Sequence, residues 1–585
     1  MSEIKSNSSA DQRLVPKTID YLMPKSEDQT REVLNQLSRG KYLSVSVEIT
    51  GFDARNDQPR LIGLVTEKLS RPVLFDLAKV SETTKEGLSQ LLGSDQIKVA
   101  FGWSYIASFL LNAGLSVKGP WFDAMLAAQL LKFGQTTAIP KFSALVSGLL
   151  DGDFGDVARK DNWGGPLTGE QLKIAAKRVW VLQPLREQLV GLLAKYYLLP
   201  VAKLEFDCLS AVVEMQTAGV KVARNKLLQL VKHLDEEESE HRSRLLDWIP
   251  EGVNINDRNI VREVLAENGI DIPNVSQWTL MTLGDHREMA DSLLACRKIQ
   301  VLKSNFLAKY LDAMDLRTSR IFPKWCQLGT STGRFSCSSP PLQNIPKTDD
   351  LRGCFVPEEG CSFVFGDFSQ IELRVAAELS GDRRMIQAFC DGRDLHRWTA
   401  SLVTRKPLEE ISPEERQAAK ALNFGLLFGM SARSLQKDSL TKYGVKMTIR
   451  QAEMFRNKFL KAYPTLFDWI QRRATSRSCW AETLCGRKRR WEPGNRKPTA
   501  WINSPIQGTA ADILKKAMGL LPGALNSYSA RIVACIHDEI ILEVDTVQAQ
   551  EVALVLKEIM EEAGAVFLKK VPTIAEVRVA SSFAG

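Results

Sequence analysis

Two stretches in the first part of the chain alternate between apolar and polar positions or run apolar. YLSVSVEIT (42–50) and RLIGLVTE (60–67) lie on either side of the polar turn around GFDARNDQPR, which predicts paired strands. Helical periodicity follows at four places, 84–93, 104–113, 122–132 and 168–195. We therefore predict an α/β block over residues 29–200, preceded by a polar segment, 1–28, that we expect to be flexible.

The remainder of the chain has a different pattern. Helical periodicity dominates residues 201–315 and includes the long charged stretch KLLQLVKHLDEEESEHRSRLLDWI, which is typical of a projecting amphipathic helix. The pattern then predicts, in order, a strand at 361–367, helices through 372–480, a basic turn region at 485–498, a helix at 506–520 and a hairpin around 533–544. The fold class is therefore multidomain, an α/β block followed by an α+β block.

Composition adds limits to this organisation. A chain of 585 residues is too long for one hydrophobic core, and its net charge of +8 suits a polyanionic partner without requiring one. The ten cysteines form no CxxC pair, which favours a reducing compartment over a zinc or disulfide framework. Because no secretory leader or long apolar run is present, we expect a soluble cytoplasmic protein that is not secreted and has no membrane partner.

Carboxylates stand at the ends of two predicted strands. In VACIHDEIILEV, His537, Asp538 and Glu539 interrupt two apolar runs, either as a solvated hairpin tip or as part of a site. In CSFVFGDFSQIELR, Asp367 ends an apolar strand just before a helix, where it could also serve only as a cap. Such carboxylates repel one another unless cations bridge them, and oxygen ligands suit Mg²⁺ or Mn²⁺. Two such ions would support an in-line phosphoryl transfer.

Two further stretches carry groups that suit a nucleotide or a nucleic acid. In ERQAAKALNFGLLFGM, Arg416, Lys420, Phe424 and Phe428 recur every four residues on one helix face, either as a triphosphate site or as an ordinary amphipathic helix. LGTSTGRFSCSSPPLQNIPK is rich in turns and hydroxyls and could line DNA or form a plain surface loop. CGRKRRWEPGNRKPTAW interleaves basic and aromatic residues, as single-strand contacts do, although a solvated loop would account for the charge.

Taken together, these motifs resemble the family A DNA polymerases, the group typified by bacterial DNA polymerase I. TGRFSCSSPPLQNIP, DFSQIELR, RQAAKALNFGLLFG, NSPIQGTAAD and HDE occur in the family's order. The resemblance implies a right-hand polymerase over 201–585, with the thumb at about 201–318, the palm at about 319–382 and 500–585, and the fingers at about 383–499. It implies DNA-directed DNA synthesis on a primer–template with deoxynucleoside triphosphates. We expect a monomer that accessory replication proteins could join, near a nucleoid or a viral replication site.

The resemblance also implies roles for individual residues. Asp367 and Asp538 would be ligands of two Mg²⁺ ions, with Mn²⁺ as an alternative, and Glu539 and Lys420 would join them in catalysis. Nucleotide binding is implied for Gln370, Glu372, His396, Arg416, Lys420, Phe424 and Phe428, where Glu372 would exclude a 2′-hydroxyl. Contact with the primer–template is implied for Arg334, Gln343, Asn344, Lys347, Gln507 and His537.

The chain departs from the family pattern in several places. Phe428 stands where Tyr is usual, and Lys347 stands where Arg is common. The first block is similar in position to the family's 3′–5′ exonuclease, a ribonuclease H-like domain that needs four carboxylates. By our alignment it keeps Glu48 but has Ser46, Ile106 and Arg178 at the other three positions, with Asp123 as a nearby substitute. We therefore expect an inactive exonuclease-like domain, and no 5′-nuclease domain ahead of it.

Our prediction is a DNA polymerase of family A without proofreading. The rival enzymes are a single-subunit RNA polymerase and a reverse transcriptase, from which Glu372 and Phe424 distinguish a deoxynucleotide-selecting site. A rival of another class is a DNA-binding scaffold without catalysis, which the retained Asp367, Asp538 and Arg416 disfavour.

Overall fold

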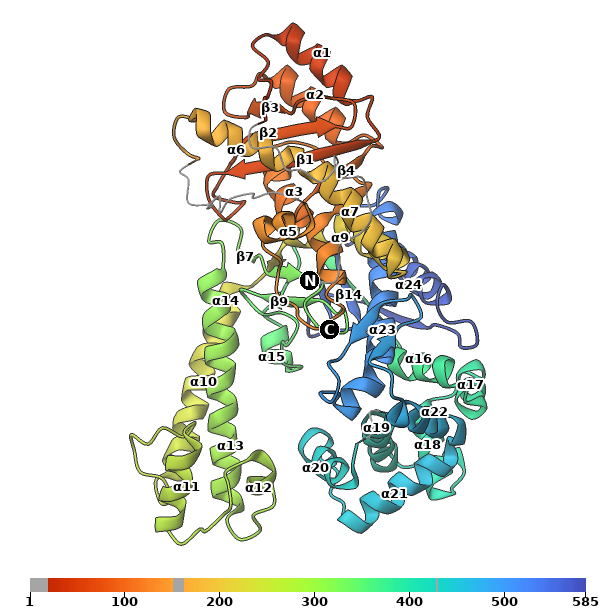
Figure 1. Ribbon diagram of the computed structural model, residues 1–585. Helices are drawn as coiled ribbons and strands as arrows, with labels where there is room; N and C mark the ends of the chain where they lie inside the picture. The colour runs from red at the N-terminus through yellow and green to blue at the C-terminus, as the bar shows by residue number, and fades with distance from the viewer. Residues whose placement is uncertain (1–18, 151–162, 428–429) are drawn as a thin grey trace.

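The computed structural model describes residues 19–150, 163–427 and 430–585 (Figure 1). Within the segment predicted to be flexible, the packed chain begins earlier than residue 28. Ile19 is buried, and Leu22 exchanges backbone hydrogen bonds with the strand that contains Leu74. The described chain has separate hydrophobic cores in its N-terminal block, around its central sheet and at the tip of its long helices, as a chain of this length requires.

The N-terminal block is built on a five-stranded sheet with the order β3-β2-β1-β4-β5. The first three strands are antiparallel, β4 pairs in parallel with β1, and β5 pairs in parallel with β4, which gives the block the α/β character that we predicted. Helices cover the sheet (Figure 1). Its strands are β1 (Tyr42–Ile49), β2 (Pro59–Thr66), β3 (Val73–Asp76), β4 (Ile97–Ala100) and β5 (Trp121–Asp123).

The helices of this block agree with the predicted positions, with two differences. The stretch 168–195 forms two helices that turn at Val181, and the stretch 122–132 begins as strand β5 before the helix starts. The helices are α1 (Glu27–Leu37), α2 (Glu82–Leu92), α3 (Trp103–Asn112), α4 (Ala124–Leu130), α5 (Phe142–Leu149), α6 (Gly169–Trp180) and α7 (Leu182–Lys195).

A pair of long helices projects from the body of the molecule (Figure 1). The predicted amphipathic stretch forms α10 (Arg224–Leu245), which packs along α13 (Arg287–Leu302). The neighbouring elements are α8 (Leu199–Asp207), α9 (Leu209–Ala218), β6 (Val220–Lys221), α11 (Arg258–Glu267), α12 (Gln277–Met281), η2 (Lys303–Leu307), α14 (Ala308–Ala313), β7 (Arg320–Ile321), β8 (Lys324–Cys326), β9 (Ser336–Ser338) and α15 (Asp349–Arg352).

The central sheet is antiparallel and has the strand order β13-β14-β10-β15. The predicted strand and hairpin are present as β10 (Cys361–Phe368), β13 (Ala530–Ile536) and β14 (Glu539–Asp545), and β15 (Ala575–Ala580) completes the sheet. Helix α24 (Ala549–Ala565) packs closely on β10. The approach is so close that a Cβ at Gly366 would lie 2.6 Å from Met560 Sδ. Helix α16 (Ile371–Ser380) follows β10 directly.

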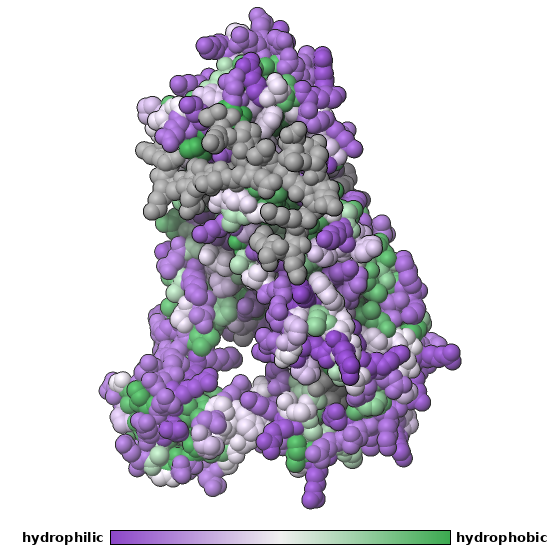
Figure 2. All heavy atoms as spheres, in the orientation of Figure 1, coloured by the Kyte–Doolittle hydropathy of each residue, from purple (hydrophilic) through white to green (hydrophobic). Residues whose placement is uncertain are grey.

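A helical lobe is inserted between β10 and β13. Its elements are α17 (Arg383–Cys390), α18 (Leu395–Thr404), η3 (Leu408–Glu410), α19 (Pro413–Leu427), α20 (Ala432–Tyr443), α21 (Ile449–Ala462), α22 (Pro464–Thr475), β11 (Trp480–Glu482) and β12 (Lys488–Arg490). In Figure 2 this lobe and the lobe of the long helices stand on either side of an open hollow, and hydrophilic side chains dominate the visible face.

The helix that returns from this lobe to the sheet is longer than predicted. We predicted 506–520, but α23 spans Pro498–Ala524 and contains Pro505 in its interior. Proline lacks the N–H that would bond to the carbonyl four residues earlier, on Trp501. Arg473 supplies the missing donor, with its Nη2 at 3.0 Å from that carbonyl oxygen. None of the helices in the described residues combines the length and the apolar character of a membrane span.

Candidate active site

Three acidic residues lie together at one end of the central sheet. β10 ends with Asp367 and Phe368, and the β13–β14 turn holds Asp538. Asp367 is paired with Glu539 in the strand register, and the backbone N of Phe368 donates to the carbonyl O of Asp538 at 3.4 Å. Directly paired residues of antiparallel strands present their side chains on the same face. Strand pairing thus brings the two predicted carboxylate motifs into one site.

The hairpin turn that presents Asp538 is held in an unusual conformation. His537 has φ +57°, a region that residues other than glycine rarely adopt. Gln343 braces the turn, because its Oε1 accepts from His537 N at 2.9 Å and its Nε2 donates to Cys535 O at 2.8 Å. Gln343 is buried, whereas His537 is exposed. Of these two predicted DNA contacts, Gln343 uses its amide to hold the turn and His537 is open to solvent.

Arg334 links the hairpin to the start of α16. Its guanidinium forms an ion pair with Glu372, and its Nη2 lies 3.9 Å from Asp538 Oδ1. Glu372 is in the first turn of α16, after Gln370, which caps the helix with φ +54°. Strained residues such as Gln370 and His537 gather at functional sites. The structure therefore joins the predicted sugar-selecting residue to a predicted metal ligand through one arginine.

The acidic side chains of this site share one electrostatic feature, which is that their surroundings disfavour their charge. Partial desolvation by the surrounding protein and the nearby charges of Glu539 and Asp538 raise the pKa of Asp367 to about 6, although the side chain remains exposed. Burial also raises the pKa of Asp538, against the opposing effect of Arg334, and the pKa of Glu539, against the opposing effect of Arg578. Repelling carboxylates of this kind fit a divalent cation, whose charge would favour their ionised forms.

The number of protein ligands also bears on which cation fits. No group of three or more His, Cys, Asp or Glu side chains in the described residues is arranged to enclose a metal by itself. Mg²⁺ often binds through only one or two carboxylates and takes its other oxygens from water and substrate phosphates. Asp367 and Asp538 fit that pattern.

The predicted nucleotide residues of the helical lobe lie on two neighbouring helices, α18 and α19. Arg416 Nε donates to Asp394 Oδ2 at 2.6 Å, and Asp394 caps the helix that carries His396. His396 is buried, with its Nδ1 at 2.8 Å from Asn423 Nδ2, and burial lowers its pKa to about 4. It is therefore neutral at pH 7. Lys420 lies one turn beyond Arg416 on the same face of α19.

The remaining predicted residues are placed as follows. Asn344 and Lys347 are exposed on the segment that follows Gln343, and Gln507 is half-buried on α23. Lys347 lies near enough to the acidic site to favour the ionised form of Asp367. Phe428 lies outside the described residues, as does the side chain of Phe424.

The sequence patterns did not point to Arg578. It lies on β15 opposite Phe365, with its guanidinium 3.6 Å from the centre of that ring and its Nη2 3.6 Å from Glu539 Oε1. A basic residue in a short strand is an ordinary surface feature, so only the pairing of β15 with β10 identifies Arg578 as a neighbour of the acidic site.

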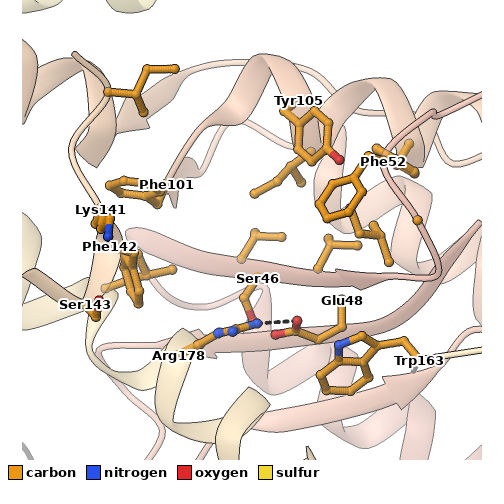
Figure 3. Close-up of a pocket in the computed structure, with 18 of the residues that line it drawn as sticks. Ser46, Glu48, Phe52, Phe101, Tyr105, Lys141, Phe142, Ser143, Trp163 and Arg178 are labelled. Carbon is orange, nitrogen blue, oxygen red and sulfur yellow. Dashed lines mark hydrogen bonds and ion pairs between the residues drawn. The ribbon is translucent and has the colours of Figure 1, made fainter. Parts of the chain in front are cut away.

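The four positions of the expected exonuclease site line one cavity of about 550 Å³ in the N-terminal block. Ser46 and Glu48 lie on β1, Ile106 lies on α3, and Arg178 lies on α6. Figure 3 shows Arg178 paired with Glu48 and aromatic side chains on the surrounding walls. That these positions meet in one cavity supports our alignment of the motifs, and among the described residues that line it the one carboxylate, that of Glu48, is paired with a cation.

Asp123, the nearby acidic residue that could have substituted for a missing ligand, has a different task. It is fully buried, and its carboxylate accepts backbone hydrogen bonds from Gly102, Trp103, Met125 and Leu126 at 2.8–3.3 Å. These contacts hold the start of α3 and cap α4. Asp123 therefore serves the fold and not the cavity.

Comparisons with known proteins agree with this architecture. Residues 224–585 match the family described as "DNA polymerase family A", and residues 21–194 match the family described as "3'-5' exonuclease". A DNA polymerase I of Aquifex aeolicus is 30% identical over 95% of this chain and 98% of its own length. The thermostable DNA polymerase I of Thermus aquaticus is 34% identical over 60% of this chain, which matches 45% of the Thermus protein.

A solved structure also resembles the chain. The POL domain of Pol1 from M. smegmatis, in complex with DNA primer-template and dNTP, has a TM-score of 0.83 with 24% identity, covering 97% of this chain and 99% of that one. At this identity the likeness bears on the fold. The chain belongs to DNA polymerase family A and is a DNA-directed DNA polymerase that carries an exonuclease-type domain ahead of its polymerase domain.

Proposed function

We propose that the chain extends a DNA primer along a DNA template by two-metal nucleotidyl transfer, without proofreading. The observation that carries the synthetic half of this proposal is the meeting of Asp367 and Asp538 on adjacent strand ends, in surroundings that raise the pKa of both. Two divalent cations, when bound there, would supply stabilisation of the attacking and leaving oxygens of an in-line displacement.

The chain's own residues would bind and orient the reactants. Arg416 and Lys420, one turn apart on α19, would hold the triphosphate by charge-assisted hydrogen bonds. To do so, Arg416 would either release Asp394 or bind Asp394 and a phosphate together. His396 is neutral, so it would donate a hydrogen bond without adding charge. Glu372, held by Arg334, would fill the space of a 2′-hydroxyl.

The fold suggests how DNA would lie. We infer that the long helices form the thumb (201–318), the central sheet the palm (319–382 and 500–585) and the helical lobe the fingers (383–499). The primer–template would occupy the hollow between the two lobes in Figure 2, with its end at the acidic site. Arg334, Asn344, Lys347 and Gln507 would contact it there. We propose that the enzyme works as a monomer in the compartment that holds this DNA, with accessory replication proteins as further partners.

Primer extension tests the synthetic half. Asp367→Ala and Asp538→Ala should abolish nucleotide incorporation with Mg²⁺ while leaving primer–template affinity largely intact, since that affinity comes mainly from phosphate contacts. Asp545→Asn is a matched control, because Asp545 lies at the far end of β14. Appreciable extension by either alanine variant, or an equal loss in the control, would refute the assignment.

The absence of proofreading rests on the cavity of the N-terminal block. Two-metal hydrolysis needs several converging carboxylates, and here Glu48 is paired with Arg178 while Ser46 and Ile106 supply no charge. A positive guanidinium in the space of a metal ion opposes cation binding. We infer that the block persists as a scaffold.

A mismatched primer tests this inference. Wild-type enzyme is incubated with a 3′-mismatched, end-labelled primer and Mg²⁺ or Mn²⁺ in the absence of nucleotides. The primer should keep its length. Shortening that disappears in Glu48→Gln would mean that the site hydrolyses DNA, and shortening that persists in Glu48→Gln would indicate a contaminating nuclease.

A further inference from the structure

An exposed surface of aromatic and basic side chains lies where the N-terminal block meets the β11–β12 hairpin. We call it the stacking surface, and its members are Lys195, Tyr197, Trp480, Lys488 and Arg490. Tyr197 is 77% exposed and Trp480 is 38% exposed, although large aromatic side chains are usually buried.

The strand pairing places most of this surface on one face of the hairpin. Trp480 pairs with Arg490, and Glu482 pairs with Lys488, so these side chains point the same way. The intervening pair points inward, where Ala481 is buried and Arg489 Nη1 lies 2.8 Å from Ser504 Oγ on α23.

Packing holds Trp480 in place, and both aromatic rings lie beside cations. Trp480 packs edge-on against Phe133, with ring centres 4.9 Å apart, and the guanidinium of Arg490 lies 5.5 Å from the Trp480 ring. Lys488 Nζ lies 5.2 Å from the ring of Tyr197. Within the described part of the chain, no carboxylate lies within ion-pair distance of Lys488 or Arg490. Both cations are therefore available to an anionic partner.

Tyr197 occupies a position that costs stability without burying its ring. It follows α7 with φ +57°, in the place after a helix where glycine is favoured. An exposed tyrosine gains little from the hydrophobic effect there. Strained residues of this kind are common at binding sites, which is consistent with a ligand for this ring.

The stacking surface also lies beside the polymerase site. Arg489 contacts Ser504, one helical turn before Gln507, which we expect to touch the primer–template end. Arg487, in the turn between β11 and β12, packs against Gly333, where a Cβ would lie 2.7 Å from Arg487 Nε. The neighbouring residue Arg334 reaches the acidic site. A template strand leaving that site would find the hairpin within reach.

We propose that the stacking surface binds the unpaired 5′ part of the template strand, an inference that rests on the proposed function. Proteins that bind single strands without sequence preference combine aromatic rings, which stack on the bases, with cations, which contact the phosphates. A duplex would hide its bases from Tyr197 and Trp480, so the rings favour single-stranded DNA.

Fluorescence anisotropy without nucleotides tests the proposal. It compares primer–templates with an unpaired template end of about 12 nucleotides, within the usual range of single-strand site sizes, and with one unpaired nucleotide. Tyr197→Ala combined with Trp480→Ala should weaken binding of the long overhang about tenfold or more and leave the short one unchanged. Tyr197→Ala alone leaves the Trp480–Phe133 packing intact. It should weaken binding of the primer–template with the long overhang severalfold.

The cations give an independent measurement. Lys488→Gln combined with Arg490→Gln should reduce the slope of log Kd against log salt by about 1.4, at about 0.7 per phosphate contact on a single strand. Lys79→Gln is the control, because Lys79 is 78% exposed on the N-terminal block away from the hairpin. Its slope should be unchanged.

Unchanged affinity of Tyr197→Ala for the long overhang would overturn the proposal and leave the surface as a candidate protein-binding site. An equal loss for both overhangs would overturn it too, because the effect would then not concern the single strand. A wild-type enzyme that binds long overhangs through these residues yet extends no primer would refute the proposed function and not the stacking surface.

Discussion

A buried network of four charged side chains joins α8 to α23 and to the turn between β11 and β12, and its disruption should be costly. Glu205 on α8 contacts Lys515 Nζ at 2.7 Å and Arg487 Nη2 at 2.5 Å, and the same Arg487 nitrogen lies 2.7 Å from Asp512 Oδ1. The network holds two acids and two bases, each at most 7% exposed. Although burial disfavours its charge, Lys515 and Arg487 hold the pKa of Glu205 below its usual range.

The two acids and two bases of the network balance in charge, and this balance sets how much stability a single substitution should cost. Lys515→Met would leave one uncompensated negative charge in the interior, which costs about 3–5 kcal/mol of unfolding free energy. Glu205→Gln should cost a similar amount for the opposite charge. The double variant restores neutrality, so its loss should be smaller than the sum of the two single losses by about 1–3 kcal/mol. Lys203→Met on the same helix removes an exposed pair with Asp207 and should cost about 1 kcal/mol or less.

Urea unfolding of the four variants and the wild type gives these free energies. Additive losses in the double variant would refute the reasoning, since they would mean that Glu205 and Lys515 contribute independently. Losses near that of Lys203→Met would refute it as well, because the charges would then be solvated. Because Gly333 packs against Arg487, Lys515→Met should also slow primer extension through the loop that carries Arg334.

The remaining predictions concern the sugar, the phosphates and pH. Glu372→Ala should raise ribonucleotide relative to deoxynucleotide insertion, measured by single-nucleotide kinetics, and an unchanged ratio would favour a gate elsewhere and strengthen the RNA-polymerase alternative. Arg416→Ala and Lys420→Ala should each lower kcat/KM about tenfold or more for all four nucleotides alike, because phosphates carry no base identity; a loss confined to one base would contradict this role. Burial raises the pKa of Glu214 to about 7 from 4.5, so stability should fall as pH rises from about 4.5 through 7, by about 3 kcal/mol in all. In unfolding experiments at several pH values, Glu214→Gln should flatten this pH dependence and match the stability of the wild type below about pH 4.5. A variant that keeps the wild-type pH profile would exclude Glu214 as the source of the pH dependence.

Local patterns were sufficient where neighbouring residues decide the structure. The alternation around β1 and β2 and the apolar runs of β10 and the β13–β14 hairpin predicted paired strands correctly. The pairing of Asp367 with Glu539 needed the family resemblance, because no local pattern tells which two strands adjoin.

Other features depend on contacts between distant segments. The predicted helix began only after Pro505, whereas α23 continues through this proline because Arg473 supplies the missing donor. Glu205 and Arg487 each look like ordinary surface charges in the sequence, and burial makes them partners. The strain at His537 likewise reflects the brace that Gln343 provides from a remote loop. Sequence periodicity contains no information on contacts of this kind.

The pairing of Glu48 with Arg178 explains how a carboxylate can remain in a cavity that we expect to be inactive. Glu48 is 5% exposed, so an unpaired charge there would be costly. Arg178 supplies the opposite charge that bound cations would supply in a working exonuclease, and removing either partner would cost about 3–5 kcal/mol. Stability alone thus favours keeping both residues. The ion pair thus gives Glu48 a structural role that does not require hydrolysis, in agreement with the inactive site that we propose.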